Sequence, residues 1–306
     1  TEVGSLFLKA DRRKGGAGRL LSQSRYMLIG AQPDLFADNV LAELRGVFTP
    51  DGYCPFWDHV AHKFFPMDFD EADRLTFGAQ DYVTLKLHAE DTAEEMTRLL
   101  DALSPLTSET APDRELLEAA RWHDTGKAHA AFQQMLIERL PIDDERRSGG
   151  PWAKSDRVHS GTNRRRFFRH ELASALAWAA SGKSDLGAFI VAAHHGKVRL
   201  SLRARPGEEP PGSEPGKRFA HGVHDGDVLP SVDLGSGVTV PEQAQALSLA
   251  CMELGGGGES ASWADRMLRL LEEHGPFRLA YLEMLIRIAD WRASRKRAPE
   301  IGGVRG

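Results

Sequence analysis

The sequence predicts an all-α fold, because helical periodicity dominates the chain and strand patterns are scarce. Seven segments carry apolar residues at three- and four-residue spacing, which is typical of amphipathic helices. Alternating strand patterns are limited to short candidates at 25–29 and 237–240. We expect helices over residues 90–103, 113–123, 128–139, 169–180, 186–195, 261–273 and 277–292.

Two parts of the chain fall outside this helical pattern. Residues 1–67 have weaker periodicity, and we interpret them as an N-terminal extension that packs beside a domain of residues 68–306. Residues 206–240 contain five prolines and seven glycines, a density that no packed helix tolerates. We therefore expect a long loop or flexible insertion at 206–240, and a second flexible joint at Gly255–Gly258.

The composition indicates a globular protein of the cytoplasm. With 306 residues and 41% hydrophobic content, the chain can bury one large core or two modest ones. Its two cysteines, Cys54 and Cys251, form no CxxC pair, which argues against a disulfide framework and against a thiolate zinc site. The apolar runs are far too short to span a membrane, and no basic-then-apolar leader opens the chain. We expect no membrane partner.

The charge of the chain is acidic overall but uneven. A formal net charge of -5 argues against a surface coated in basic residues for duplex DNA. Local basic segments can still bind phosphates, although most arginine runs are solvated surface. The basic segments are Lys154, Arg157, Arg164, Arg165, Arg166 and Arg169; Lys197, Arg199, Arg203 and Arg205; and Arg292, Arg295, Lys296 and Arg297.

A His-Asp pair stands at the end of a predicted helix. In the stretch RWHDTGKAHAAFQ, His123 and Asp124 follow the amphipathic run 113–122, and we expect Gly126 to provide the left-handed cap that stops the helix. A helix end can face a cavity. One His-Asp dipeptide is weak support for a metal site, because chance and ordinary capping explain most of them.

Possible metal ligands recur at or near the apolar faces of other predicted helices. Burying several unpartnered imidazoles and carboxylates in one core is costly, and metal coordination is the simplest explanation for such a set. The alternative treats each residue singly, as a core histidine bonded to a backbone carbonyl or, for Asp290, as a partner of Arg287. The candidate ligands are His88, His170, His194, His195 and Asp290.

The order of these motifs resembles the HD superfamily of metal-dependent phosphohydrolases. Within it, the chain is most similar to the HD nuclease domain of the CRISPR-associated nuclease-helicase of type I interference systems. The resemblance runs from about His88 to Ser294. The matching motifs are His123-Asp124-Thr-Gly-Lys127, Phe132-Gln133, Arg169-His170-Glu171, His194-His195-Gly196 and Ala289-Asp290-Trp-Arg-Ala-Ser294.

The resemblance implies a helical bundle around a dinuclear metal site that cuts single-stranded DNA. It assigns one ion to His88, His123, Asp124 and Asp290, and the second to Asp124 as a bridge with His170, His194 and His195. It assigns catalytic roles to His123, Asp124 and Lys127, the last as a cation beside the metals. His59 and His62 are rivals of His88 for the first histidine of the family.

The ligand set also indicates the kind of metal. Five imidazoles and two carboxylates suit iron, manganese, cobalt, nickel or zinc better than magnesium. Such a centre contacts no bases, so basic side chains would guide the strand by its phosphates. For this role we expect Arg164, Arg165, Arg166, Arg169, Lys197 and Arg199.

The chain lacks the G-x-x-x-x-G-K-[ST] loop of an ATP-driven motor. The resemblance therefore implies a helicase motor elsewhere, in the same or a separate chain, and a guide-RNA surveillance complex that delivers the displaced strand. Two alternatives stay open. One is an HD phosphohydrolase acting on nucleotides or cyclic dinucleotides, and the other is a non-catalytic HD interaction domain.

Overall fold

The computed structural model describes residues 15–35, 82–103, 113–156, 160–161, 165–196, 198–205, 207–209, 211–212, 216–254 and 261–296. The chain divides into two compact units, residues 1–70 and 71–306, and the predicted boundary after residue 67 lies close to this division. Among the described helices, none has the length and apolar character needed to cross a membrane.

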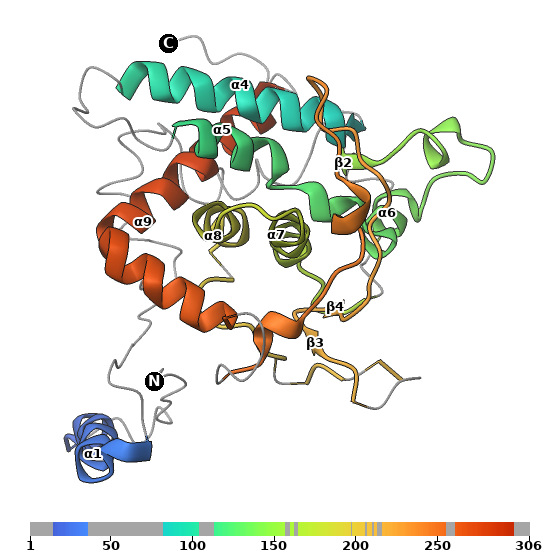
Figure 1. Ribbon diagram of the computed structural model, residues 1–306. Helices are drawn as coiled ribbons and strands as arrows, with labels where there is room; N and C mark the ends of the chain where they lie inside the picture. Colours follow the sequence, from blue (N-terminus) through green and yellow to red (C-terminus); the bar gives the residue numbers. More distant parts are fainter. Residues whose placement is uncertain are drawn as a thin grey trace. The chain divides into compact units, whose positions relative to one another are not determined.

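The described part of the first unit is one helix and a short turn (Figure 1). Helix α1 spans Ala17–Ala31, the 3₁₀ helix η2 spans Pro33–Leu35, and neither buries a residue. The predicted strand at 25–29 is wrong, because these residues lie inside α1. A short apolar run such as Tyr-Met-Leu-Ile fits either structure, and periodicity alone cannot separate the two.

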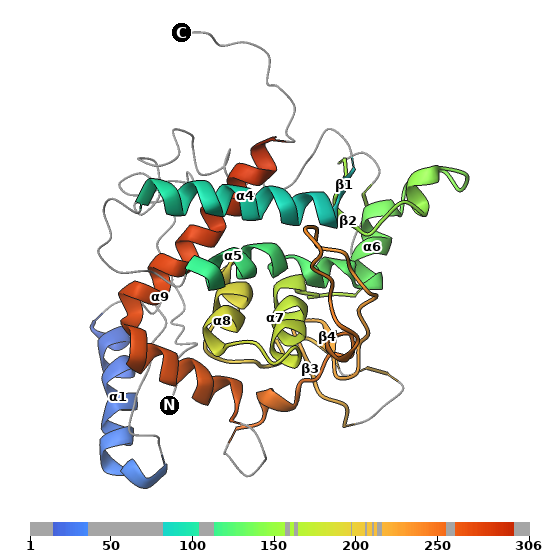
Figure 2. The same ribbon diagram turned by 45° about the horizontal axis from the view of Figure 1, so that its top comes forward.

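The second unit is a bundle of helices, which confirms the all-α fold and the seven predicted helical segments. Figures 1 and 2 show α7 and α8 side by side, with α5 next to them and α4 beyond α5. The helices are α4 (Leu85–Leu103), α5 (Asp113–Trp122), α6 (Ala130–Ile137), α7 (His170–Ala180), α8 (Asp185–Ala193) and α9 (Trp263–Lys296).

Helix α8 lies in the centre of the bundle because its sequence is apolar on every side. All residues from Leu186 to Ala193 are buried, as expected for a helix without a polar face. Ser184 caps the helix by accepting a hydrogen bond from the backbone N–H of Gly187. A Cβ on Gly187 would stand 2.1 Å from the ring of Trp178, so this glycine permits the close approach of α7.

Helix α9 contains the break that separates the last two predicted helices. Gly275 has φ 72° and ψ 161°, which are non-helical values that glycine adopts without strain. Pro276 follows and provides no backbone N–H for a hydrogen bond to the preceding turn. The segment after the break carries Asp290.

Short strands supplement the helices. Strand β1 (Val83–Thr84) pairs antiparallel with β2 (Trp152–Lys154), and β3 (Phe219–Ala220) pairs with β4 (Val223–His224). The remaining 3₁₀ helices are η5 (Thr125–Ala128), η6 (Glu145–Arg147), η7 (Glu242–Ala244) and η8 (Ala250–Met252). The predicted strand at 237–240 is wrong, because within it only Thr239 makes a bridge, to Asp233.

The Pro/Gly-rich segment is a long loop as predicted, but residues 216–240 are packed, which corrects the expectation of a flexible insertion. Val223, Leu229 and Leu234 are fully buried. The carbonyl of Leu234 accepts a hydrogen bond from Arg121 of α5, at 2.9 Å. Turn residues rule out a helix here but do not prevent burial of the apolar side chains between them. The proposed joint at 255–258 lies outside the described residues.

Candidate metal centre

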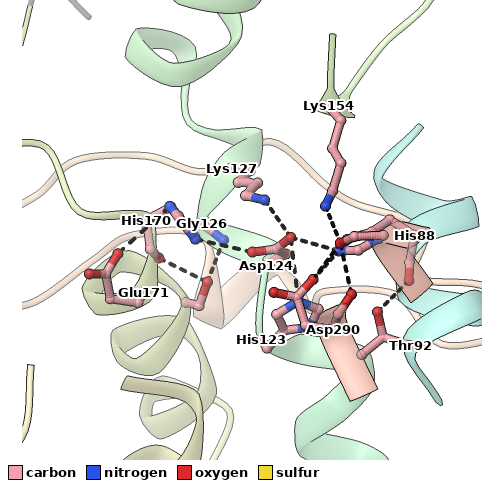
Figure 3. Close-up of polar contacts among 12 residues, drawn as sticks. His88, Thr92, His123, Asp124, Gly126, Lys127, Lys154, His170, Glu171 and Asp290 are labelled. Carbon is pink, nitrogen blue, oxygen red and sulfur yellow. Dashed lines mark hydrogen bonds and ion pairs between the residues drawn. The ribbon is translucent and has the colours of Figure 1, made fainter. Parts of the chain in front are cut away.

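Histidine and aspartate side chains from five parts of the second unit meet at one buried place (Figure 3). The ends of helices supply most of them, since α5 ends just before His123, α7 begins at His170 and α8 ends just before His194. Helix α4 contributes His88 and α9 contributes Asp290. All seven predicted ligands lie in this cluster: His88, His123, Asp124, His170, His194, His195 and Asp290.

A close contact between η5 and α7 holds the His-Asp turn in place. The backbone N–H of Gly126 donates to Ser174 Oγ at 2.7 Å. A Cβ at Gly126 would lie 2.1 Å from the carbonyl oxygen of His170. Gly126 lies within the 3₁₀ helix η5 and is not among the glycines with positive φ. The expected left-handed cap is therefore wrong, and the glycine is required by packing.

The cluster forms two groups that share Asp124. On the Oδ1 side of Asp124, His170 Nε2 lies at 3.1 Å and His194 Nε2 at 3.7 Å. On the Oδ2 side, His88 Nε2 lies at 3.2 Å and His123 Nε2 at 3.4 Å. Ligand atoms of Asp124, His170, His194 and His195 lie within 4.8 Å of one another, as do those of His88, His123 and Asp290.

Backbone carbonyls fix which ring nitrogen faces Asp124. His123 Nδ1 lies 2.7 Å from the carbonyl oxygen of Ala120, and His194 Nδ1 lies 2.6 Å from that of Val191. A carbonyl only accepts hydrogen bonds, so in both rings Nδ1 carries the proton and donates it. This leaves Nε2 of each ring directed at the carboxylate, as in histidines that ligate metals.

Apart from the ion-pair contacts just described and that of Asp124 with Lys127, the buried atoms at the centre make no hydrogen bond among the described residues. They are the Nε2 atoms of four histidines and both carboxylate oxygens of Asp124. Leaving so many buried polar atoms unpaired costs several kcal/mol or more, at roughly 1–3 kcal/mol each. Cations placed between the imidazoles and the carboxylate would satisfy all of them at once, so the residues fit a metal centre. The four histidines are His88, His123, His170 and His194.

The ionisation states of the cluster also suit a metal centre. Burial alone would raise the pKa of Asp124, but His123 and Lys127 beside it hold this pKa well below its usual range. Burial likewise opposes ionisation of Asp290, and Lys154 and the neighbouring imidazoles hold its pKa well below the usual range. Both carboxylates are therefore ionised at neutral pH. Burial also lowers the pKa of His170 and of His195, which keeps these rings neutral.

Two lysines border the centre. Lys127 is 8% exposed, and its Nζ lies 2.6 Å from Asp124 Oδ2. Lys154, which the sequence placed in a basic segment, is buried as well and donates a hydrogen bond to Ser294. Ser294 donates in turn to the backbone carbonyl of Asp290 at 2.7 Å. Sequence patterns alone did not indicate that Lys154 and Ser294 lie beside the site.

The structure describes four of the six basic residues predicted to bind nucleic acid, and two of the four are paired with carboxylates in strong contacts. Arg165 pairs with Asp227, and Arg199 makes two bonds to the Glu283 carboxylate at 3.0 and 2.9 Å. These partners neutralise the charge of both arginines. Arg166 stacks over the ring of Phe167, and Arg169 directly precedes α7. Arg164 and Lys197 lie outside the described residues, as do the rival ligands His59 and His62.

Two family models match different parts of the chain. The model described as "Cas3, HD domain" matches residues 74–298, which is more than half of the chain. The model described as "Arginine N-succinyltransferase beta subunit" matches residues 1–93. The matches overlap at residues 74–93, and the structure places β1 and the start of α4 in the second unit.

The curated relatives resemble a smaller part of the chain. "Arginine N-succinyltransferase" from Escherichia coli O139:H28 (strain E24377A / ETEC) and from Shigella boydii serotype 18 (strain CDC 3083-94 / BS512) are each 40% identical over 121 residues. That stretch is 39% of this chain and 35% of each relative, so the chain spans about a third of their length. No solved structure matches the chain. The transferase likeness of the N-terminal part was not foreseen from the sequence.

Proposed function

Since the chain belongs to the Cas3 HD-domain family, we propose that its second unit is a metal-dependent nuclease that cleaves single-stranded DNA in CRISPR antiviral interference. The observation that carries the proposal is the position of Asp124. Its two carboxylate oxygens face two separate groups of imidazoles inside a buried centre. A carboxylate placed in this way can bridge two cations.

The residues divide between the two proposed ions by their contacts. His88, His123 and Asp290 would hold one ion, and His170, His194 and His195 the other, with Asp124 shared. Two divalent ions supply a nucleophilic water at neutral pH and neutralise charge on the attacking and leaving oxygens of a phosphodiester. Asp124 sets the spacing of the two groups, and the Nδ1 bonds of His123 and His194 keep these rings oriented.

Lys127 is suited to the substrate because its ammonium group borders the centre. Its Nζ already lies beside Asp124, and a phosphodiester near the same carboxylate would bring a negative charge within its reach. The nitrogen-rich ligand set favours manganese, iron, cobalt, nickel or zinc over magnesium. We propose this metal preference, and we expect no sequence recognition by the metal ligands, because they act on the phosphodiester and base contacts are what specify sequence.

The partners are proposed from the family. A guide-RNA surveillance complex would deliver the strand and a helicase motor would move it, with the reaction in the cytoplasm. Arg166 is the best placed of the proposed strand-guiding residues that the structure describes, because Arg165, Arg169 and Arg199 each face a carboxylate. We do not extend the proposal to arginine succinylation, because the transferase match covers only 35% of those relatives.

The test is cleavage of circular single-stranded DNA by chelator-treated protein to which one divalent metal at a time is returned. We expect nicking with manganese, iron(II), cobalt or nickel, weak activity with magnesium, and slow cutting of blunt duplex DNA, which is stiffer than a single strand. Asp124→Ala is the matched inactive control.

Other outcomes would contradict the proposal. Turnover of free nucleotides or cyclic dinucleotides that oligonucleotides do not inhibit would favour the phosphohydrolase alternative. Protein that binds no metal and cleaves nothing would favour an interaction domain. Full activity with magnesium alone would show that the ligand assignment is wrong.

A further inference from the structure

Glu171 is a buried carboxylate that the proposed mechanism does not use. It follows His170 in the first turn of α7, and it is 0% exposed. Neither of its carboxylate oxygens accepts a hydrogen bond from the described residues. A buried carboxylate without partners costs several kcal/mol, so its presence calls for a positive group nearby.

The groups nearest to Glu171 are an imidazole and a guanidinium. Glu171 Oε2 lies 3.7 Å from His170 Nδ1, and Oε1 lies 4.0 Å from Arg169 Nε. On the opposite side of the same ring, His170 Nε2 lies 3.1 Å from Asp124 Oδ1. Figure 3 shows the His170 ring between the two carboxylates. His170 is thus held between an inner carboxylate at the centre and an outer one behind it.

This arrangement differs from that of the neighbouring ligands. The outer nitrogens of His123 and His194 face neutral backbone carbonyls at 2.7 and 2.6 Å. At 3.7 Å the Glu171 carboxylate accepts no hydrogen bond from the ring, but its negative charge in the buried core attracts a cation on the opposite side of the ring. Arg169 offsets part of the charge, and its side chain is 32% exposed, so water screens it more than it screens Glu171.

We propose that Glu171 is a positioning residue that strengthens metal binding by His170. The inference rests on the proposed two-metal centre and deepens it. It predicts that the affinity for one ion, but not for the other, depends on a carboxylate behind the ligands. The ion held by Asp124, His170, His194 and His195 depends on Glu171. The ion held by His88, His123 and Asp290 does not.

The experiment is calorimetric titration of chelator-treated full-length protein with Mn²⁺, comparing wild type with Glu171→Gln. Glutamine keeps the shape of the side chain and removes its charge. We expect one of two binding events to weaken by roughly 10- to 100-fold, as is usual for outer partners of metal ligands, and the other to change by less than about twofold. His170→Ala should remove the same event.

Two further variants separate this role from general damage to the fold. Glu171→Asp keeps the charge and should recover most of the lost affinity, even if Glu171→Gln proves unstable. Glu115→Gln is the matched control, because Glu115 is a half-buried carboxylate that accepts a backbone hydrogen bond from Gly187 in the first turn of α8, whereas His194 follows the last turn. It should leave both binding events unchanged.

The possible failures are distinguishable. Two binding events in wild type that Glu171→Gln leaves unchanged, or weakens equally, would overturn the role of Glu171 and leave the two-metal centre standing. Wild-type protein that binds no Mn²⁺ would overturn the metal centre itself, and this inference with it.

Discussion

Helices α1 and α8 both contain many apolar residues, yet their surroundings are opposite. Helix α8 buries every residue from Leu186 to Ala193, whereas α1 buries none and exposes Leu20, Met27 and Leu28 by 69%, 72% and 53%. Each helix forms where its sequence favours one. Whether an apolar face is covered depends on the other elements of its unit, which a local pattern does not report. Helices α1 and α8 therefore differ in packing and not in helix-forming sequence.

The candidate metal ligands follow the same division. Every candidate metal ligand that the structure describes belongs to the second unit, where packed helix ends hold the imidazoles in place. The first unit resembles a different family and contributes no residue to the centre among the described ranges. We therefore expect changes in the second unit to have large effects and matched changes in the first to have small ones.

The largest effect is expected from Asp124→Ala. This change removes the shared carboxylate from both groups and leaves two cations facing each other with less negative charge between them. We expect loss of both metals and a fall in cleavage of at least about a thousandfold, measured by elemental analysis and by cutting of circular single-stranded DNA. A variant that keeps two metals per chain would contradict the bridge. If Asp124 were only a helix-end residue, the change would cost roughly 0.5 to 2 kcal/mol of stability and no metal.

The same substitution in two helices tests the packing difference directly. Leu116 in α5 is 0% exposed and Leu20 in α1 is 69% exposed. Leu116→Ala should lower the free energy of unfolding of the second unit by about 2–5 kcal/mol, because it leaves a cavity. Leu20→Ala should change stability by less than about 0.5 kcal/mol. Urea unfolding followed by circular dichroism measures both, and equal losses would show that α1 is packed as tightly as α5.

Lys127→Ala should separate catalysis from metal binding. In the proposed mechanism the ammonium group is a phosphate partner and not a ligand, so metal content should stay nearly intact. Cleavage should slow by roughly a hundredfold, which is typical for loss of one group that stabilises charge in the transition state. Lys86→Ala, which alters an exposed lysine paired with Asp233, is the control. Loss of metal from Lys127→Ala would assign the lysine a structural role instead.

Removal of residues 1–70 should have the smallest effect. The division of the chain after Asp70 leaves all seven ligands of the described centre in the remaining unit. We expect metal content and single-strand cleavage within about twofold of the full chain. A shortened protein that folds but loses its metal would show that the first unit supports the centre, and the contrast between the two units would not hold for function.

The sequence predicted the helices and the ligands better than the surroundings of the ligands. His123, Asp124, His170 and His194 stand at helix ends, and helix ends can be recognised locally from periodicity and turn residues. Lys154 could not be assigned, because its burial depends on pairing between β1 and β2, which lie some seventy residues apart in the chain. Glu171 was visible in the RHE motif, but its lack of partners is a property of the packed core.

The burial of the loop at 216–254 was also not predictable from its local sequence. Its glycines and prolines correctly exclude an α-helix, yet Leu229, Leu234 and Leu247 are buried. Two side chains from other helices fix the loop, since Arg121 of α5 donates to the carbonyl of Leu234 and Lys86 of α4 pairs with Asp233. The role of Gly126 was likewise not predictable from local sequence. A glycine is needed there because a side chain would collide with the carbonyl of His170 in α7. From the local sequence alone, the same glycine was interpreted as a helix cap.

The most direct test of the account is a crystal structure of the manganese-loaded protein with anomalous diffraction from the metal. We expect two anomalous peaks on opposite sides of the Asp124 carboxylate. One should lie among His88, His123 and Asp290, and the other among His170, His194 and His195. A single peak, or a second peak away from Asp124, would contradict the two-metal centre.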